Sequence, residues 1–150
     1  MSSDRSLQTF FILVIEDNAA DVHLLELALK KAGLNFKLVV LEDGAEAMAF
    51  IRREDKYAKI PIPDLAILDL NLPRTSGMEV LAALRRSALA SVPVAIVTSS
   101  SAPQERMKAQ ALHVERFITK PPDLEDFLQM GTTLKEVLLG SQDSLGSAPE

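Results

Sequence analysis

The chain of 150 residues contains no cysteine, and this absence excludes several kinds of chemistry. A chain without cysteine has no disulfide framework, no thiolate metal ligand and no thiolate nucleophile. Its first residues also lack the basic stretch, the long apolar segment and the small-residue cleavage site of a secretory signal. We therefore expect a cytoplasmic protein.

The chain also lacks long apolar runs and an excess of basic residues. No apolar run approaches the ~20 residues of a membrane-spanning helix, so no membrane partner is expected. The formal net charge is −5, from 21 acidic and 16 basic residues, and such a charge repels nucleic acid unless a basic patch overrides it. The arginine pairs, Arg52-Arg53 and Arg85-Arg86, lie near the ends of helical patterns, where cations favour the helix dipole. No nucleic-acid partner is expected either.

Short apolar runs alternate with helical patterns along the chain. We predict five strands, which cover residues 10–15, 37–41, 65–68, 94–97 and 116–118. Several of these runs are apolar throughout, as is typical of strands that helices cover on both faces. The alternation predicts an α/β fold, with a doubly wound parallel sheet of five strands in a single core.

Each of the five predicted helices has a start signal in the sequence. The expected caps or first residues are Asn18, Asp43, Gly77, Pro103 and Asp123. The length and these elements predict one domain over residues 1–140, a flexible tail over residues 141–150 and no output domain after it.

Two of these helices carry specific core expectations. The core candidates of the fourth helix, which is weak in apolar content, are Met107, Ala111 and Leu112. The residues expected to face inward on the fifth helix are Leu124, Phe127, Leu128, Gly131, Leu134 and Leu138.

Asp69 is the most informative single residue, because it directly follows the apolar run 65–68 and precedes a loop with Pro73. In open α/β sheets, ligands bind outside the carboxyl ends of the strands, so an acid at this place is a candidate functional group. The alternative is that Asp69 only starts a turn, since Asp and Asn side chains form local hydrogen bonds to the backbone in turns.

Other polar residues follow the remaining strands, and a parallel sheet brings them to the same edge. Glu16 and Asp17 end the first strand, Thr98 ends the fourth, and Lys120 follows the fifth. Each has an ordinary alternative explanation: a loop for the two acids, a surface ion pair for Lys120, and a β-branched strand residue for Thr98. Together with Asp69 they predict a functional site.

The chemistry of such a site follows from its charges. Three carboxylates repel one another unless a cation neutralises them, and a set of oxygen ligands suits Mg²⁺. No histidine or cysteine stands among them to favour a softer metal. The Asp69 carboxylate is then able to attack a phosphoryl group and form an aspartyl-phosphate. Lys120 and Thr98 would neutralise or hydrogen-bond the phosphoryl oxygens.

With these motifs the chain resembles, from residue 10 to about residue 139, a receiver domain of the two-component response regulators. The matching segments are 13–18 (LVIEDN), 63–73 (PDLAILDLNLP), 76–77 (SG), 93–99 (PVAIVTS) and 117–121 (FITKP). The resemblance implies a flavodoxin-like (βα)5 fold with strand order 2-1-3-4-5. It also implies phosphorelay signalling by a single-domain regulator, which takes a phosphoryl group from a histidine kinase or phosphotransfer protein and is not an enzyme with a separate substrate.

The resemblance implies a role for each residue that carries the phosphoryl chemistry. Asp69 would be the phosphoacceptor, and Lys120 would bind the phosphoryl group. Thr98 and Phe117 would form a switch pair. When Asp69 is modified, Thr98 would move toward the phosphoryl oxygens and Phe117 would rotate inward. This movement would change the face made by the fourth helix, the fifth strand and the fifth helix.

The resemblance also implies a set of Mg²⁺ ligands. Asp17 would be a direct ligand together with Asp69, and Glu16 would act largely through metal-bound water. The backbone carbonyl of Asn71 would complete the protein ligands. The peptide bond between Lys120 and Pro121 would be cis, as in similar proteins.

Some positions differ from the common receiver pattern. Glu16 stands where an aspartate is more usual, and His113-Val114 replaces a frequent Gly-Ala pair before the last strand. These differences, with the long connection over residues 57–63, resemble the stand-alone regulators that serve bacterial phytochrome-type histidine kinases. A kinase of that type is therefore an expected partner, and a homodimer is a further expectation.

Two rival interpretations remain open at this point. A phosphatase of the haloacid-dehalogenase type also forms an aspartyl-phosphate with Mg²⁺, but it usually has an acid two positions after the nucleophile, where this chain has Asn71. A receiver-like interaction module that never accepts phosphate is the other rival, and its expected sequence sign is an incomplete site.

Overall fold

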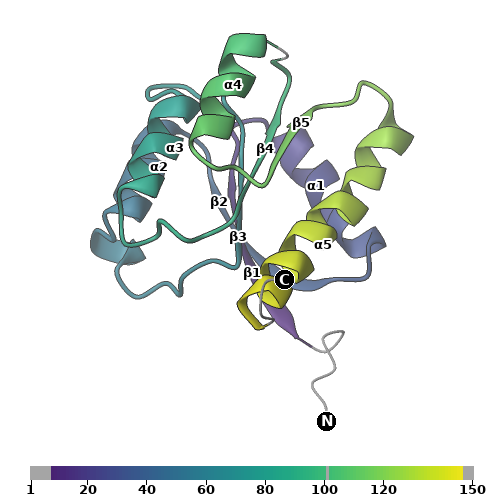
Figure 1. Ribbon diagram of the computed structural model, residues 1–150, viewed down its shortest axis with the longest axis horizontal. Coiled ribbons are helices and arrows are strands. Elements are labelled where there is room, and N and C mark those ends of the chain that lie inside the picture. Colours follow the sequence, from purple (N-terminus) through teal and green to yellow (C-terminus); the bar gives the residue numbers. More distant parts are fainter. Residues whose placement is uncertain (1–7, 101, 147–150) are drawn as a thin grey trace.

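A parallel sheet forms the centre of the structure. The structure is a computed structural model, and it describes residues 8–100 and 102–146. Over these residues, five strands are arranged in the order β2-β1-β3-β4-β5 (Figure 1). The strands are β1 (Thr9–Ile15), β2 (Asn35–Leu41), β3 (Leu65–Leu68), β4 (Val94–Thr98) and β5 (Arg116–Thr119). The helices are α1 (Ala19–Lys31), α2 (Gly44–Ile51), α3 (Gly77–Arg85), α4 (Pro103–Ala111) and α5 (Leu124–Gly146), with a short 3-10 helix at Asp55–Tyr57. The predicted fold class and strand order are confirmed.

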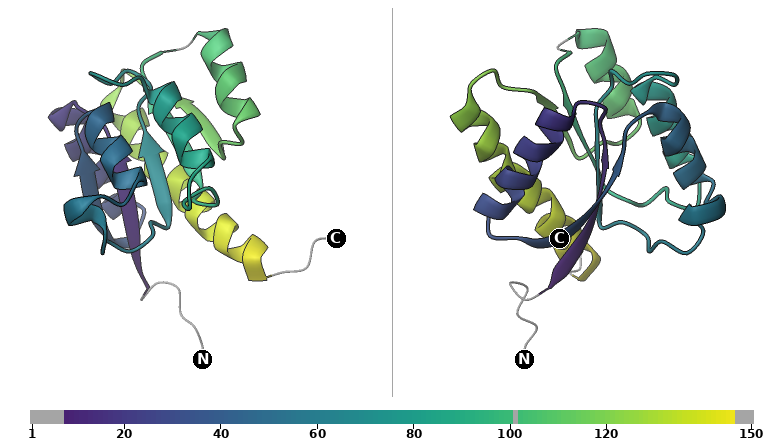
Figure 2. Two further views of the ribbon diagram at one scale, coloured as in Figure 1. Left: turned by 90° about the vertical axis from the view of Figure 1, so that its left-hand side faces the viewer. Right: turned by 180° about the vertical axis from the view of Figure 1, so that it is seen from behind.

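Helices cover both faces of the sheet. α1 and α5 pack on one face, and α2, α3 and α4 lie on the other (Figures 1 and 2). The side chains of β1 alternate between two apolar clusters, with Ile12 and Val14 toward α1 and α5, and Leu13 and Ile15 toward the opposite face. Every residue of β3 is buried, as expected for a central strand covered on both sides. Among the described residues, no helix has the length and apolar character needed to cross a membrane.

The strand register aligns the carboxyl ends of the strands at one edge of the sheet. Ile15 at the end of β1 pairs with Leu68 at the end of β3, and Leu68 pairs with Ile96 in β4. Thr98 pairs with Thr119 in β5. The residues that directly follow these strands therefore meet at the same edge.

Side-chain hydrogen bonds confirm the start signals of α1 and α2, and α3 begins at Gly77 as predicted. The side chain of Asn18 accepts from the backbone N–H groups of residues 20 and 21, and Asp43 accepts from that of Glu46. Ser76, before Gly77, forms a reciprocal capping box with Glu79. These bonds satisfy backbone donors that the first turn of a helix leaves unpaired. They also fix where each helix leaves the sheet edge.

α1 and α5 approach each other closely at one glycine. A Cβ atom built on Gly131 would lie 2.0 Å from the carbonyl oxygen of Ala28 in α1. Gly140, in the same helix, has no atom within 4 Å of such a Cβ. Gly131 is therefore a packing residue of the interface between α1 and α5.

The inward face of α4 differs from the prediction. Met107 is 69% exposed and Ala111 is also exposed, whereas Ala109 is fully buried. Residues 107 and 111 each lie two positions from 109, about 200° around a helix of 3.6 residues per turn. The buried side of this short helix is thus the side of Ala109, a small residue. The prediction holds only for Leu112, which is half-buried and packs against the core.

α5 differs from the sequence expectation at both ends. Leu124 is 57% exposed, because it lies in the first turn, ahead of Phe127, the first buried residue of the helix. The helix also continues to Gly146, six residues beyond Gly140, where we expected the flexible tail to begin. The sequence 141–146 has no proline to end the helix, and a single glycine costs only about 1 kcal/mol in a helix interior.

Arg85 ties the end of α4 to the loop before β4. Its guanidinium donates to four backbone carbonyl oxygens at 2.8–2.9 Å, including those of Val92 and Leu112. The turn after Leu112 contains His113 at φ 62°, a left-handed conformation that glycine adopts more easily. This conformation explains why glycine is frequent at this position in similar receivers. Histidine is able to replace it because histidine adopts the left-handed conformation more often than most residues.

Candidate functional site

The sheet edge predicted from the sequence carries a connected set of polar side chains. The backbone ladder continues one residue beyond β1, β3 and β5. The N–H of Glu16 donates to Leu41 at 2.9 Å, and that of Asp69 donates to Ile15 at 3.0 Å. The N–H of Lys120 donates to the carbonyl of Thr98 at 2.7 Å. Because their backbones are held in the sheet, these three side chains start from fixed positions.

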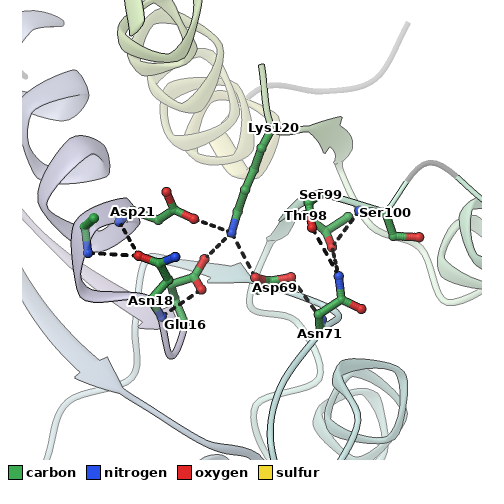
Figure 3. A network of polar contacts seen from close by, with 10 residues as sticks. Glu16, Asn18, Asp21, Asp69, Asn71, Thr98, Ser99, Ser100 and Lys120 are labelled. Carbon is green, nitrogen blue, oxygen red and sulfur yellow. Dashed lines mark hydrogen bonds and ion pairs between the residues drawn. The ribbon is translucent and has the colours of Figure 1, made fainter. Parts of the chain in front are cut away.

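The ammonium group of Lys120 lies at the centre of this set (Figure 3). Its Nζ atom is 2.9 Å from Oδ2 of Asp69 and 2.8 Å from Oε1 of Glu16. It is also 2.6 Å from Oδ2 of Asp21. The side chain of Lys120 is only 12% exposed, so these three contacts replace most of its hydration. The structure thus brings together Glu16, Asp69 and Lys120, as predicted.

Asp21 is a site residue that the sequence argument did not identify. The sequence suggested only a helix-dipole role for an acid in the first turn of α1. One signal was available: helical side chains point toward the N-terminus of their helix, and the N-terminus of α1 directly follows Glu16 and Asp17. Asp21 therefore points back toward the sheet edge.

The carboxylate of Asp69 is buried but well supplied with hydrogen-bond donors. Asp69 is 5% exposed, and its Oδ1 atom accepts a hydrogen bond from the backbone N–H of Asn71 at 3.0 Å. Burial alone would raise the pKa of this carboxyl. Hydrogen bonds from the Asn71 backbone, Lys120 and Thr98 outweigh burial and hold the pKa below its ordinary value. Asp69 is therefore ionised at neutral pH.

Glu16 has the opposite balance. Burial, with a further contribution from the charge of Asp69, raises its pKa to about 7, against the lowering effects of Lys120 and of the Asn18 N–H. That N–H donates to Oε2 of Glu16 at 3.1 Å. The same edge therefore holds one carboxylate that is firmly ionised and one that titrates near neutral pH.

The pKa of Lys120 shows that the cation is stabilised where it lies. Burial would lower the pKa of the ammonium group, but hydrogen bonds to Asp21, Glu16 and Asp69 raise it well above its ordinary value. Lys120 therefore carries a full positive charge beside Asp69 throughout the physiological pH range.

Thr98 lies on the other side of Asp69 and is fully buried. Its Oγ1 accepts from the backbone N–H of Ser100 at 3.4 Å and lies 3.5 Å from Nδ2 of Asn71. The amide of Asn71 also donates to Oγ of Ser99 at 3.3 Å (Figure 3). Asn71 thus links the loop after β3 to the loop after β4.

Phe117 lies away from this hydrogen-bonded set, in the apolar core beside α4. It is 8% exposed, and the guanidinium carbon of Arg106 lies 5.1 Å from the centre of its ring. Arg106 belongs to α4, so the ring of Phe117 connects β5 with that helix. The ring of Phe117 is thus already buried in this structure, and its predicted movement after phosphorylation stays a prediction.

Three acids at this edge of the sheet offer carboxylate oxygens that could bind a divalent cation. One carboxylate oxygen each from Glu16, Asp17 and Asp69 lies within 4.8 Å of the other two. Asp17 is exposed, whereas the other two are buried. Hard cations such as Mg²⁺ and Mn²⁺ prefer oxygen ligands. The residues present therefore fit a divalent metal.

The loop behind Asp69 depends on a glycine. A Cβ atom on Gly77 would lie 2.5 Å from the carbonyl oxygen of Asp69 and 2.4 Å from Cα of Leu70. The N–H of Gly77 donates to the carbonyl of Leu70 at 3.0 Å. Gly77 thus allows the start of α3 to lie directly against the residue that carries the site.

The predicted cis peptide bond is absent, and this expectation was wrong. The bond between Lys120 and Pro121 is trans. The trans form of an X–Pro bond is favoured by roughly 0.5–1 kcal/mol, and the contacts of Lys120 with its three carboxylates form without the cis isomer.

Comparison with known proteins identifies the family. The family model of the response regulator receiver domain matches residues 12–131. The chain belongs to the response regulator receiver domain family. Response regulator Rcp1 of Synechocystis sp. strain PCC 6803 is 37% identical to this receiver over 129 residues, which cover 85% of this chain and 88% of Rcp1.

Solved structures of similar receivers agree with the fold described above. The phosphorylated cyanobacterial phytochrome response regulator RcpA is 35% identical, with a TM-score of 0.82, and the alignment covers 95% of this chain and 100% of RcpA. The Mn²⁺-bound form of Rcp1 is also 35% identical, with a TM-score of 0.78, covering 85% of this chain and 92% of that one. Members of the family signal through an aspartyl-phosphate and a divalent cation, and the acidic group of this receiver fits both.

Proposed function

We propose that this receiver accepts a phosphoryl group on Asp69 from a histidine kinase or a phosphotransfer protein. The observation that carries the proposal is the 2.9 Å contact between Nζ of Lys120 and Oδ2 of Asp69 at the carboxyl edge of the sheet. This contact supports a site in which the proposed nucleophile, Asp69, and the proposed phosphate-binding cation, Lys120, are adjacent before phosphorylation. The lowered pKa of Asp69 keeps the nucleophile ionised.

In the transfer step, a carboxylate oxygen of Asp69 attacks the phosphorus atom of a phosphohistidine. A P–O bond forms while the P–N bond breaks, and the electron pair of the broken bond stays on the ring nitrogen. The imidazole, protonated at its other nitrogen, leaves as a neutral group. The Asp69 carboxylate must offer one oxygen to phosphorus, while the Asn71 N–H at 3.0 Å stabilises the other.

The residues around Asp69 have separate roles in this proposal. Lys120 neutralises charge on the phosphoryl oxygens, and the Thr98 hydroxyl donates a hydrogen bond to them. Asp17 and Asp69 would bind Mg²⁺ directly, with the backbone carbonyl of Asn71, and Glu16 would act through metal-bound water. When bound, Mg²⁺ supplies positive charge that offsets the charge of the phosphoryl group.

Asn71 favours a signalling role over turnover. A phosphatase of the haloacid-dehalogenase type usually has an acid two positions after its nucleophile, to protonate the leaving group. Asn71 occupies that position, and its amide is bonded instead to Ser99. An amide does not act as a general acid at neutral pH. The aspartyl-phosphate should therefore persist long enough to be recognised by a partner.

Signal transmission is proposed to pass through Thr98 and Phe117. A phosphoryl group on Asp69 would attract the Thr98 hydroxyl and so favour the buried position of Phe117, whose ring already contacts Arg106 of α4. α4 has a single buried residue, Ala109, so its position depends on few contacts. The surface formed by α4, β5 and α5 would respond.

The partner kinase is proposed to be of the phytochrome type, on the basis of the similarity to Rcp1 and to the phytochrome response regulator RcpA. Association of two copies through the surface of α4, β5 and α5 is proposed as the readout. A cytoplasmic location and the absence of a nucleic-acid partner stay predictions.

The test is incubation with acetyl phosphate and Mg²⁺, followed by intact-protein mass spectrometry of the wild type, Asp69→Asn and a control, Glu46→Gln. Glu46 is an exposed acid of α2. One added phosphoryl group on the wild type and control, but not on Asp69→Asn, supports the proposal. Continuous release of phosphate would favour a phosphatase, and no gain with any donor would favour an inert module.

A further inference from the structure

The ammonium group of Lys120 has more carboxylate partners than the proposed phosphoryl chemistry requires. Its three N–H donors match three acceptors, one each from Asp69, Glu16 and Asp21 (Figure 3). The contact with Asp21, at 2.6 Å, is the shortest of the three. The proposed transfer step assigns no role to Asp21, so its contact with Lys120 needs an explanation of its own.

The position of Asp21 is fixed by the same cap that adjoins Glu16. Asn18 donates its backbone N–H to Glu16 at 3.1 Å, and its side chain accepts the backbone N–H of Asp21 at 3.1 Å. The Asp21 side chain is 20% exposed, so the ion pair with Lys120 is largely shielded from water. Glu16, Asn18 and Asp21 thus form a hydrogen-bonded frame on one side of the ammonium group.

Asp21 also differs from the other two acids in its relation to the metal group. Glu16 and Asp69 belong to the three acids whose oxygens lie within 4.8 Å of one another, and Asp21 does not. Glu16 and Asp69 would therefore have a second task as metal-binding acids, whereas the contact of the Asp21 carboxylate is with Lys120.

We propose that Asp21 is a positioning residue that acts through Lys120. By accepting one N–H of the ammonium group, it holds the cation at the sheet edge. The other two N–H donors, which contact Asp69 and Glu16 in this structure, are then placed to meet the incoming phosphoryl group. The inference rests on the proposed phosphorylation of Asp69. A charge-assisted bond of this length restrains a flexible lysine chain that otherwise samples many rotamers.

The simplest alternative is that Asp21 only stabilises the first turn of α1 through the helix dipole. If Asp21 acts only through the helix dipole, its replacement should change the stability of the protein and leave the position and mobility of the Lys120 ammonium group unchanged. The variants Asp21→Asn, Asp21→Ala and Asp21→Glu separate the two ideas. Glu46→Gln is the matched control, since it also removes an acid from the first turn of a helix, α2, and Glu46 does not contact Lys120.

The first measurement is the ¹H–¹⁵N spectrum of the Lys120 ammonium group in metal-free protein, assigned with Lys120→Arg. We expect a sharp, slowly exchanging Nζ signal in the wild type and in Glu46→Gln. In Asp21→Ala the signal should broaden or disappear, and in Asp21→Glu it should return. An unchanged signal in folded Asp21→Ala and Asp21→Asn would overturn the inference, whatever the phosphorylation results.

The second measurement is the rate of phosphoryl gain from acetyl phosphate at saturating Mg²⁺. Asp21→Ala and Asp21→Asn should slow the gain about tenfold, because a misplaced charged group loses transition-state stabilisation, and Glu46→Gln should leave it within twofold. In a Lys120→Ala background, Asp21→Asn should change the rate by less than twofold. An equal slowing in both backgrounds would show that Asp21 does not act through Lys120.

The two measurements separate the failure of this inference from the failure of the proposed function. A wild-type protein that gains no phosphoryl group contradicts the proposed function, while the Nζ signal still decides the role of Asp21. Asp21→Asn serves as a second variant if Asp21→Ala does not fold, because asparagine keeps the size of the side chain and one acceptor oxygen.

Discussion

The ammonium nitrogen of Lys120 lies 2.9 Å from Oδ2 of Asp69, although the two residues are 51 positions apart in the chain. Both follow the ends of parallel strands, β5 and β3, and β4 separates these strands in the sheet. The long Lys120 side chain crosses the end of β4 and places a cation against a buried carboxylate. This relationship places a cation beside the carboxylate that we propose as the phosphoacceptor.

Replacement of Lys120 by methionine should expose the repulsion among the acids. Without the cation, the free energy of unfolding at pH 7 in the absence of divalent metal should fall by about 3 kcal/mol, because buried carboxylates lose their partner. Addition of Mg²⁺ should raise the unfolding temperature of Lys120→Met more than that of the wild type. The exposed Lys108 supplies the control, Lys108→Met. An equal response to Mg²⁺ in all three proteins would argue against a shared site.

Glu16 should make stability depend on pH. Its folded pKa of about 7 exceeds the ordinary value of 4.5, so the folded protein binds more protons than the unfolded chain between these values. The contribution of Glu16 to the free energy of unfolding therefore decreases as pH rises from 4.5 to 7. Glu16→Gln should be more stable relative to the wild type at pH 8 than at pH 5, by roughly 1–3 kcal/mol. Urea unfolding at both pH values measures this difference, and a constant difference would contradict the assignment.

Two glycines of α5 should respond in opposite directions to the same change. Gly131→Ala should destabilise the protein by about 1–3 kcal/mol, because its Cβ would overlap the carbonyl of Ala28. Gly140→Ala should stabilise it by about 0.5–1 kcal/mol, since that position has space and alanine favours helix. Thermal unfolding of both variants is the measurement. Equal shifts would show that α1 and α5 do not pack as described.

Arg85 should not tolerate lysine. Its planar guanidinium donates to four carbonyl oxygens, and a lysine has three donors without the fork geometry. Arg85→Lys should therefore lower the free energy of unfolding by about 2 kcal/mol, through carbonyls left unpaired. The neighbouring Arg86 is exposed, and Arg86→Lys should have no measurable effect. Hydrogen exchange should also increase at residues 109–114 in Arg85→Lys alone.

The sequence was sufficient for those parts of the molecule that rest on strand ends and backbone signals. The strands, the helix caps and the convergence of Glu16, Asp69 and Lys120 follow from periodicity and from the geometry of a parallel sheet. The inward face of α4 did not follow, because the small Ala109 packs inward while the larger Met107 points to solvent.

Local stereochemistry and side-chain reach were harder to predict. The trans bond before Pro121 differs from the family-based expectation, and the two isomers differ too little in energy for the sequence to decide. The ion pair between Asp21 and Lys120 joins residues 99 positions apart, and its one sequence signal was the direction in which helical side chains point. An acid in the first turn of a helix is favoured by the helix dipole alone, so the residue type at position 21 does not require a second contact.

The most direct test of the central claim is to locate the acyl phosphate within the chain. Reduction of the phosphorylated protein with borohydride converts a phosphorylated aspartate to homoserine, and peptide mass spectrometry then identifies the modified residue. We expect homoserine at position 69, at no other acid, and only after incubation with acetyl phosphate and Mg²⁺. Modification of Glu16, Asp17 or Asp21 in place of Asp69, or no modification at all, would contradict it.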